Sequence, residues 1–144
     1  MKSGVALRRK HMSAFSYDVY AAKCPTRKAL DRIADKWTAL IVGLLAERTY
    51  RFGQLRRGID GISQKVLTQT LRNMEMDGLV VRTPVDTSPP TVEYSLTPLG
   101  RTLIEPLAAI RDWAEQHIEE LEAARASADA GVKRRPSKSA RTGQ

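Results

Sequence analysis

Residues 61–100 contain the pattern that constrains the fold most: an amphipathic helix followed by two short strands around a proline-rich turn. Ser63 can accept a hydrogen bond from an unpaired backbone N–H two or three residues further on, so it is the predicted N-cap. Gly78 suits the left-handed conformation that ends many helices, and the β-branched residues after it disfavour a longer helix. We therefore expect a helix that begins after Ser63 and ends near Asp77.

The predicted helix has two chemically different faces. One face repeats at the i, i+3, i+4 spacing of a buried stripe, through Val66, Leu67, Thr70, Leu71 and Met74. The opposite side carries only polar side chains: Gln64, Lys65, Thr68, Gln69, Arg72 and Asn73. The first face is expected to pack against the rest of the domain, which leaves the second one free.

Two short strands are predicted after the helix, at residues 79–83 and 91–96. In the second, Val92, Tyr94 and Leu96 alternate with polar residues at the period of a half-buried strand. Residues 84–90 between them are rich in turn formers and prolines, which cannot extend a sheet edge. We expect a hairpin with a long tip; a plain loop is the alternative. In such an arrangement the free face of the helix can lie in a DNA major groove, and the hairpin that follows can lie along the neighbouring backbone.

The other helices are predicted from weaker patterns. Residues 26–34 favour a short first helix, residues 37–46 a largely buried second one, and residues 52–58 a short helix before a turn at 58–62. The apolar side of the second helix comprises Trp37, Leu40, Ile41, Leu44 and Leu45. The expected fold class is mainly α with a small β-hairpin, in which two helices joined by a turn precede the hairpin.

A last long helix can open at Pro98, whose missing N–H would be unpaired in the first turn anyway. Its apolar stripe comprises Leu99, Leu103, Leu107, Ile110, Trp113, Ala114, Ile118 and Leu121. A stripe over six turns is longer than a small domain can cover, so its surplus is expected to pack against the same helix of a second subunit. The segment around Phe15, Tyr17, Val19 and Tyr20 is expected to join this interface. The alternative is that the helix folds back on its own domain.

Length and composition indicate one small domain: 144 residues, of which 42% are apolar. No run of about 18 apolar residues could span a bilayer, and the basic N-terminus lacks the apolar segment of a secretory signal. The single cysteine, Cys24, excludes an intrachain disulfide framework and agrees with a reducing compartment. The protein is therefore expected to be cytoplasmic, with no membrane partner.

The net charge of +8 is concentrated outside the predicted domain. Residues 24–121 hold thirteen basic and thirteen acidic residues, whereas residues 1–23 and 122–144 each carry an excess of four positive charges. Within the domain, residues 48–82 hold seven basic residues against three acidic ones. A locally positive face on a neutral body is the distribution that phosphate binding needs, although a solvated charge run would look similar.

The two ends differ from the body in composition. Residues 1–23 are expected to form a partly disordered N-terminal arm, in which a His11–Met12 junction leaves Met12 as an alternative start. Residues 122–144 are rich in Ala, Ser, Lys and Arg and have Val132 as their one large aliphatic residue, so a disordered basic tail is expected. The tail either solubilises the protein or adds nonspecific attraction to DNA.

Three blocks of sequence, with the spacing between them, carry a resemblance to a known family. They are CPTRKALDRIADKWTALIVGLL at 24–45, RTYRFGQLRRGIDGISQKVLTQTLRNMEMDGLVVRT at 48–83 and PPTVEYSLTPLGRTL at 89–103. Over residues 24–121 the chain resembles the HxlR-type winged helix-turn-helix transcriptional regulators, relatives of the MarR group. The resemblance implies a winged helix-turn-helix domain with extra terminal helices for dimerisation. It also implies a bacterial homodimer that binds double-stranded DNA.

The free helix face supplies the predicted DNA-binding residues: Ser63, Gln64, Lys65, Thr68, Gln69 and Arg72 on the helix, with Arg82 on the hairpin. Glutamine can pair with adenine and arginine with guanine, whereas Lys65 and the Ser63 region suit phosphate. Arg82 and the tip at 86–91 would touch the flanking backbone or minor groove. Two copies related by a two-fold axis would need a near-palindromic operator, with half-sites about 10 bp or a multiple of it apart.

Cys24 is the predicted regulatory residue. In the resembling family, the cysteine that opens this block serves in some members as a sensor of oxidants, quinones or aldehydes. Lys23, Arg27, Lys28 and a helix N-terminus near Pro25 are expected to lower the pKa of the thiol. The alternative is a small buried residue at the subunit interface, and any disulfide of Cys24 must be intermolecular or with a small thiol.

Other classes of function fit less well. An enzyme would need a nucleophile, base or metal constellation, and besides its carboxylates the chain offers His11, His117 and Cys24. The acidic residues of the last helix are better explained as a solvated face than as metal ligands, so neither a metal nor a cofactor is expected. The main alternative is a winged helix used for protein contacts without specific DNA binding. That alternative predicts an apolar face on the helix after Ser63.

Overall fold

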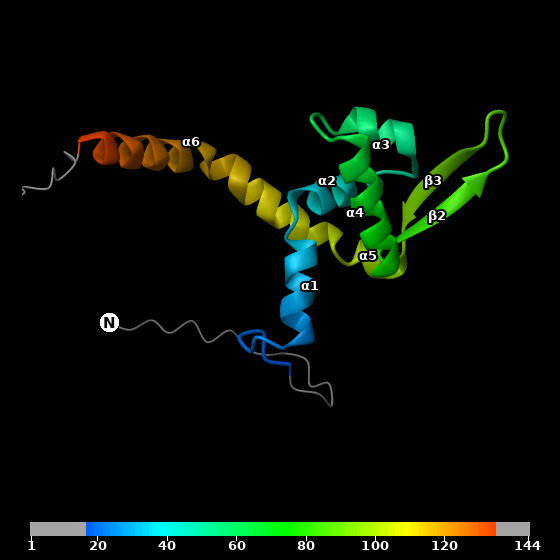
Figure 1. The fold of residues 1–144 in the computed structure, drawn as a ribbon, viewed down its shortest axis with the longest axis horizontal. Coiled ribbons are helices and arrows are strands. Elements are labelled where there is room, and N and C mark those ends of the chain that lie inside the picture. Colours follow the sequence, from blue (N-terminus) through cyan, green and yellow to red (C-terminus); the bar gives the residue numbers. More distant parts are fainter. Residues whose placement is uncertain (1–16, 135–144) are drawn as a thin grey trace, which may run out of the picture.

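The structure, a computed structural model, describes residues 17–134. Over these residues the chain forms six helices and three strands, drawn in Figure 1. In order they are α1 (Pro25–Ile33), α2 (Lys36–Leu45), β1 (Tyr50–Arg51), α3 (Phe52–Gly58), α4 (Gln64–Met76), β2 (Val80–Val85), β3 (Thr91–Leu96), α5 (Pro98–Arg101) and α6 (Ile104–Arg134). The predicted class, mainly helical with a small antiparallel sheet, is confirmed.

Helix α4 has the ends that the sequence predicts. The Ser63 Oγ accepts a 3.1 Å hydrogen bond from the backbone N–H of Val66, which makes Ser63 the N-cap. At the other end Gly78 has a φ of 74°, and the N–H groups of Gly78 and Leu79 donate to the carbonyls of Glu75 and Met74. These paired bonds close the last turn of α4, because they satisfy carbonyls that lack partners within the helix.

The predicted hairpin is confirmed, and it gains a third strand. The sheet is antiparallel in the order β1-β3-β2, with Val80 opposite Leu96 and Val85 opposite Thr91. Strand β2, which was predicted at residues 79–83, runs from Val80 to Val85 and so ends two residues later than predicted. The turn between β2 and β3 is therefore shorter than predicted, at residues 86–90. Tyr50 of β1 lies opposite Tyr94 of β3. Strand β1 was not predicted because two residues are too few to show a period.

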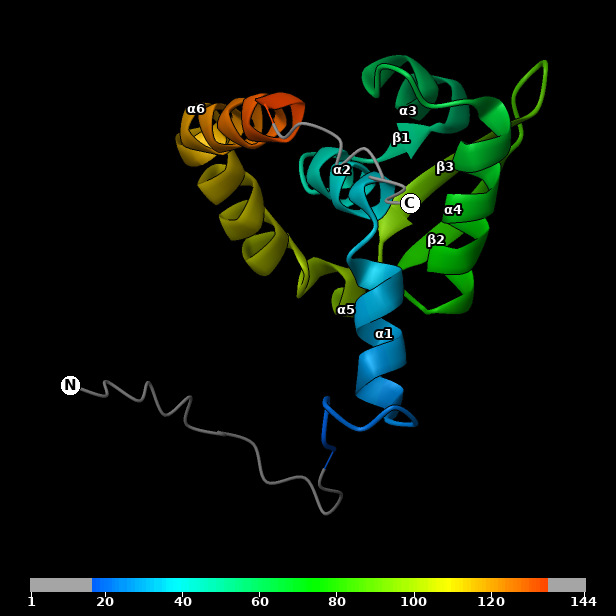
Figure 2. The same cartoon turned by 60° about the vertical axis from the view of Figure 1, so that its left-hand side comes forward.

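The core lies between α2, α3, α4 and the sheet (Figure 2). Its most deeply buried side chains are Ile41, Val42, Leu45, Leu55, Leu67, Leu71 and Met74. Two residues assigned to buried faces, Leu40 and Val66, are exposed instead. Val66 lies in the first turn of α4, where a side chain leans toward the helix start and away from the core. Leu40 lies on the side of α2 that faces a hollow beside α6.

The predicted last helix is divided into α5 and α6 by a turn at Thr102 and Leu103. Pro106 accounts for the break, since its ring would clash with the carbonyl of Thr102 in a continuous helix. As predicted, Pro98 opens the first of the two helices. Leu107 is buried against the core, whereas Leu99, Ile110, Trp113, Ile118 and Leu121 are exposed.

The predicted disordered tail is wrong over residues 122–134, where α6 continues and projects away from the body (Figure 1). Residues 122–130 include five alanines besides Glu122 and Arg125, and these residue types favour a helix even where it buries little surface. Two sets of predictions lie outside the described residues: those on Phe15, His11 and Met12 in the N-terminal arm, and those on residues 135–144 of the tail. Within the described part, none of the helices has an apolar stretch long enough to cross a membrane.

Candidate nucleic-acid interface

The outer face of α4 is polar and accessible. All of its predicted DNA-binding side chains are exposed: Ser63, Gln64, Lys65, Thr68, Gln69 and Arg72. Their spacing along one helix brings them together on one side, opposite Leu67 and Leu71, which are buried. The face therefore offers amide, ammonium and guanidinium groups to a partner outside the chain.

Besides Ser63, whose Oγ caps the helix, two of these side chains are partly engaged within it. The Thr68 hydroxyl donates a 2.8 Å hydrogen bond to the carbonyl of Gln64, and the Gln69 amide donates a 3.2 Å bond to Asn73 Oδ1. For Lys65 and Arg72 the structure shows no ion pair with any residue in the range 17–134. The cations are thus free to meet an external anion, and the Gln69–Asn73 pair holds one amide in a fixed orientation.

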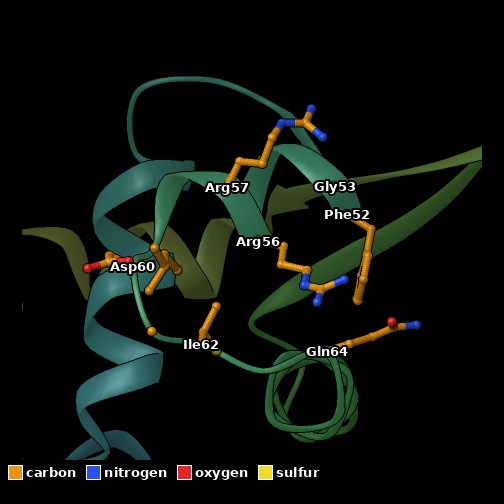
Figure 3. Close-up of a pocket in the computed structure, with 9 residues that line it drawn as sticks. Phe52, Gly53, Arg56, Arg57, Asp60, Ile62 and Gln64 are labelled. Atoms are coloured by element: carbon orange, nitrogen blue, oxygen red, sulfur yellow. The ribbon is translucent and has the colours of Figure 1, made fainter.

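A hollow of about 580 Å³ lies beside the N-terminus of α4, between α3 and the turn that follows it. Figure 3 shows Arg56 reaching from α3 toward Phe52 and Gln64, while Arg57 extends in another direction, toward Gly53. Arg57 folds back along α3, as its distance to Gly53 shows: Arg57 Nη1 lies 3.2 Å from the position that a Cβ would take on Gly53. The hollow thus places one guanidinium next to the first residue of the outer face of α4.

Arg56 and Arg57 were not predicted as site residues, although their charge contributes to the local positive excess of the sequence. Their signal was their position on the helix before the turn, since the first helix of a helix-turn-helix crosses the DNA backbone. Gly61, with a φ of 82°, makes the turn, and Ile59 and Ile62 are buried on either side of it. This packing fixes the orientation of α3 relative to α4.

The base of the hairpin is tied to α3. The Gln54 side-chain oxygen accepts a 2.9 Å hydrogen bond from the backbone N–H of Arg51, and the Arg48 guanidinium lies 3.8 Å from the centroid of the Tyr50 ring. Across the sheet, Arg51 pairs with Glu93 at 3.7 Å. These contacts hold the hairpin in a set position beside the helices.

Arg82 lies on β2, opposite Tyr94, and is exposed. The hairpin extends beyond the helical body (Figure 1), and most of its tip, residues 86–90, is exposed. Thr87 orders the tip, because its hydroxyl lies 2.9 Å from the carbonyl of Pro89 and 3.1 Å from the Thr91 hydroxyl. The structure therefore places Arg82 on the projecting hairpin. The other six predicted DNA-binding residues lie on α4 or, in the case of Ser63, at its N-cap.

Cys24 is the N-cap residue of α1 and is buried, with 7% of its surface exposed. Burial raises the pKa of its thiol, but hydrogen-bonding interactions with the Thr26 side chain and with the backbone of Arg27 and Thr26 lower it by more, against the charge of Asp18. The net effect is a pKa below the ordinary value. The expected direction of the pKa shift is found, and the start of α1 contributes through the backbone of Thr26 and Arg27, whereas the charges of Lys23, Arg27 and Lys28 are not among its causes.

Helices α2, α3 and α4, followed by the β2–β3 hairpin, define a winged helix-turn-helix protein. In it α3 and α4 are the two helices of the helix-turn-helix, and α4 has the exposed polar face. A family model described as "HxlR-like helix-turn-helix" matches residues 32–122. The chain therefore belongs to the HxlR-like helix-turn-helix family, and it is a transcriptional regulator of the helix-turn-helix type.

Relatives and solved structures agree with this assignment. The helix-turn-helix transcriptional regulator YtfH of Escherichia coli (strain K12) is 44% identical over 108 residues, which cover 75% of this chain and 86% of that protein. The structure of the transcriptional regulator ytfH from Salmonella typhimurium matches with a TM-score of 0.71 and 39% identity, over 76% of this chain and 98% of that one. The redox regulator HypR in its oxidized form matches with a TM-score of 0.60 and 39% identity, over 65% and 96%.

Proposed function

We propose that the protein binds double-stranded DNA sequence-specifically, with α4 in the major groove. The observation that carries this proposal is the exposed polar face of α4, whose Gln64, Gln69 and Arg72 side chains can pair with base edges. Lys65 and Ser63, nearer the helix start, suit backbone phosphates. A face used for protein contacts would be expected to expose large apolar side chains at its centre, and this one exposes amides and cations.

Arg56 and Arg82 extend the interface beyond α4. Arg56 lies at the hollow beside Gln64, and Arg82 lies on the hairpin. Because phosphates flank the major groove on both sides, cations on either side of a reading helix can fix its register without reading the sequence. We assign Arg56 to one flanking backbone, and Arg82 with the tip at 86–90 to the other backbone or the minor groove.

A homodimer is part of this proposal. Helix α6 exposes a stripe of large apolar side chains, in which Ile110 and Trp113 are 65% and 54% exposed. Such a stripe on a helix that extends beyond its own domain is a site for self-association, and two-fold pairing is the commonest arrangement. A two-fold dimer would present two copies of α4 and therefore recognise a near-palindromic operator with half-sites about one helical turn, or a multiple of it, apart.

Selection of bound fragments from the source genome by the purified full-length protein tests the function. The expected result is a set of fragments that share a near-palindromic motif and bind with an affinity that falls steeply as salt rises, because phosphate contacts release counterions. Fragments without a shared motif, bound no better than random duplex, would instead favour the winged helix as a protein-interaction module.

A response to oxidants or electrophiles is a second proposal, and it rests on Cys24. The thiol has a lowered pKa, which raises its thiolate fraction, and one of the structural relatives is a redox regulator. With a single cysteine in the chain, oxidation by diamide would join two Cys24 thiols of different chains, which lose two electrons and two protons while diamide is reduced to the hydrazine.

The redox proposal is tested by comparing wild type with Cys24→Ser before and after diamide. We expect the treatment to change the operator affinity of wild type and to leave that of Cys24→Ser unchanged, with a disulfide-linked dimer on a non-reducing gel for wild type alone. An equal response of both proteins to diamide would exclude Cys24 from the regulation.

A further inference from the structure

A second hollow, of about 360 Å³, lies between α1, α2 and the end of α4, away from the α3 side of the interface. Figure 2 shows the C-terminal end of α1 beside α2, α5 and the end of α4. Asp31, Asp35 and Asp77 line this hollow, and Arg32 is the one cation among its lining residues. The hollow therefore carries a net negative charge.

Arg32 and Asp77 form a close ion pair, with 2.9 Å between Arg32 Nε and Asp77 Oδ2. Both residues lie at the C-terminal end of a helix, where the helix dipole adds partial negative charge. The Arg32 side chain is 53% exposed and that of Asp77 only 24% exposed. Asp77 is thus held in place, whereas the guanidinium can swing into solvent and leave the carboxylate to another cation.

Thr38 is an independent sign of a ligand. It is 96% buried by surface, with 4% exposed, it lines the hollow, and among residues 17–134 its hydroxyl has no hydrogen-bond partner. Thr70, also buried, instead donates a 2.7 Å bond to the carbonyl of Val66 one turn earlier. In the described part of the chain, every completely enclosed polar side-chain atom has a hydrogen-bond partner. The Thr38 oxygen has none among these residues, so it is not completely enclosed, and because Thr38 lines the hollow we infer that its oxygen is accessible from there.

The carboxylates are not arranged for a metal ion. Within the described part of the chain, no three His, Cys, Asp or Glu residues are grouped closely enough to hold one. An organic ammonium needs no such group of ligands, because one carboxylate and one neutral acceptor can take its N–H bonds while further carboxylates attract it by charge alone. The acidic lining therefore suits an organic cation better than a metal ion.

An apolar hollow of about 200 Å³ adjoins the acidic one on the other side of the ion pair. The two share Arg32, Asp77 and Leu79, and the second is lined by the apolar side chains of Ile33 and Leu103, with part of Leu99. Together the hollows offer an acidic end and an apolar end within the usual size range of small-molecule sites.

We propose that these two hollows form a binding site for a small organic cation with an apolar body. Its ammonium group pairs with Asp77 and donates a hydrogen bond to Thr38 Oγ1, while Asp31 and Asp35 add negative charge to the lining, and its apolar body passes Leu79 into the second hollow. The bound cation replaces Arg32 at Asp77, so that the end of α4 is released from α1. Binding at this site does not depend on the proposed contact with DNA.

Calorimetric titration of the full-length protein with 2-phenylethylammonium chloride tests the site. We expect binding with a dissociation constant at or below about 1 mM, and about tenfold weaker binding of the matched neutral and anionic probes, 2-phenylethanol and phenylacetate. Equal dissociation constants for all three probes, or no binding of the ammonium at concentrations of about 10 mM, would overturn the proposal.

Variants locate the site and reveal the competition. Asp31→Asn should weaken binding of 2-phenylethylammonium about threefold, whereas Arg32→Gln should strengthen it by a similar factor because the internal competitor is removed. Asp129→Asn, on the distant part of α6, is the control and should bind as wild type does. Thr38→Val removes the hydroxyl at constant shape and should weaken binding about fivefold.

Asp31 and Arg32 are both exposed enough to be replaced without loss of the fold, which a thermal melt of each variant checks. Weaker binding by Arg32→Gln, or unchanged binding by Asp31→Asn, would show that the cation does not occupy this hollow. Because none of these titrations contains DNA, their outcome is separate from that of the DNA-binding proposal.

Discussion

The Thr97 hydroxyl donates a 2.6 Å hydrogen bond to the carbonyl of Gly78 and accepts a 3.0 Å bond from the backbone N–H of Gly100. One side chain therefore joins the end of α4 to the start of α5 across the base of the hairpin. Replacing it by valine leaves the Gly78 carbonyl and the Gly100 N–H without these partners. We expect Thr97→Val to lower the free energy of unfolding by about 1–2 kcal/mol, measured by urea denaturation. Serine at this position keeps the hydroxyl, so a loss of the same size in Thr97→Ser would contradict this role.

Gly100 is packed against the backbone of Leu79. A Cβ at this position would overlap the Leu79 carbonyl oxygen, and backbone atoms cannot move aside as a flexible side chain can. We expect Gly100→Ala to cost about 2 kcal/mol or more of stability in thermal or urea denaturation. Gly43→Ala is the matched control, because its Cβ meets only the end of the Arg111 side chain, and it should be neutral or stabilising by up to about 1 kcal/mol. Equal effects of the two substitutions would show that the close approach is unimportant.

Cys24 should react as a thiol of lowered pKa. Because polar groups near the sulfur favour its thiolate, the normalised pH profile of alkylation by iodoacetamide should have its midpoint below that of the urea-unfolded chain. By the same linkage, the thiolate contributes stability that is present above the unfolded pKa and is lost as pH falls through the folded pKa. Coincident midpoints for the folded and unfolded chains would remove the electrostatic basis of the redox proposal.

The exposed stripe on α6 makes the proposed dimer testable without DNA. Trp113 stacks on His117 with ring centroids 4.9 Å apart, in the middle of the stripe. An Ile110→Glu/Trp113→Glu variant should run as a monomer in size-exclusion chromatography with light scattering, because it places charges in an interface that would be buried. Glu119→Gln, about half a turn around α6 from the stripe, is the control and should keep the mass of wild type. A wild-type protein of monomer mass at micromolar concentration would contradict the dimer.

Much of the interface could be predicted because its signals are local. The bounds of α3 and α4 follow from residues that act on their immediate neighbours: the Ser63 cap, the turn at Gly61 and the stop at Gly78. The division between α5 and α6 was also present locally, at Pro106, but the long apolar stripe around it favoured one continuous helix. The strength of a pattern over many residues thus outweighed a single residue that breaks it.

Features that depend on residues distant in sequence could not be predicted in this way. The pairing of Arg32 with Asp77 joins two helices 45 residues apart, and neither residue belongs to a motif that points to the other. Arg56 is nearer in sequence to Gln64, and its signal was its place on the helix before the turn; its position beside Gln64 depends on the buried Ile59 and Ile62, which set the orientation of α3 relative to α4. The helix over residues 122–134 is a different case, in which helix propensity prevailed although every residue from 122 to 132 is exposed.

The central claim, that the outer face of α4 reads DNA bases, is tested most directly by fluorescence anisotropy with Arg72→Ala on the selected operator and on single-base variants of it. We predict a loss of operator affinity of about tenfold or more and a relaxed preference at one position per half-site, at unchanged thermal stability. Arg101→Ala, an exposed arginine on α5, should bind the operator as wild type does. Unchanged affinity and unchanged base preference in Arg72→Ala would contradict the account.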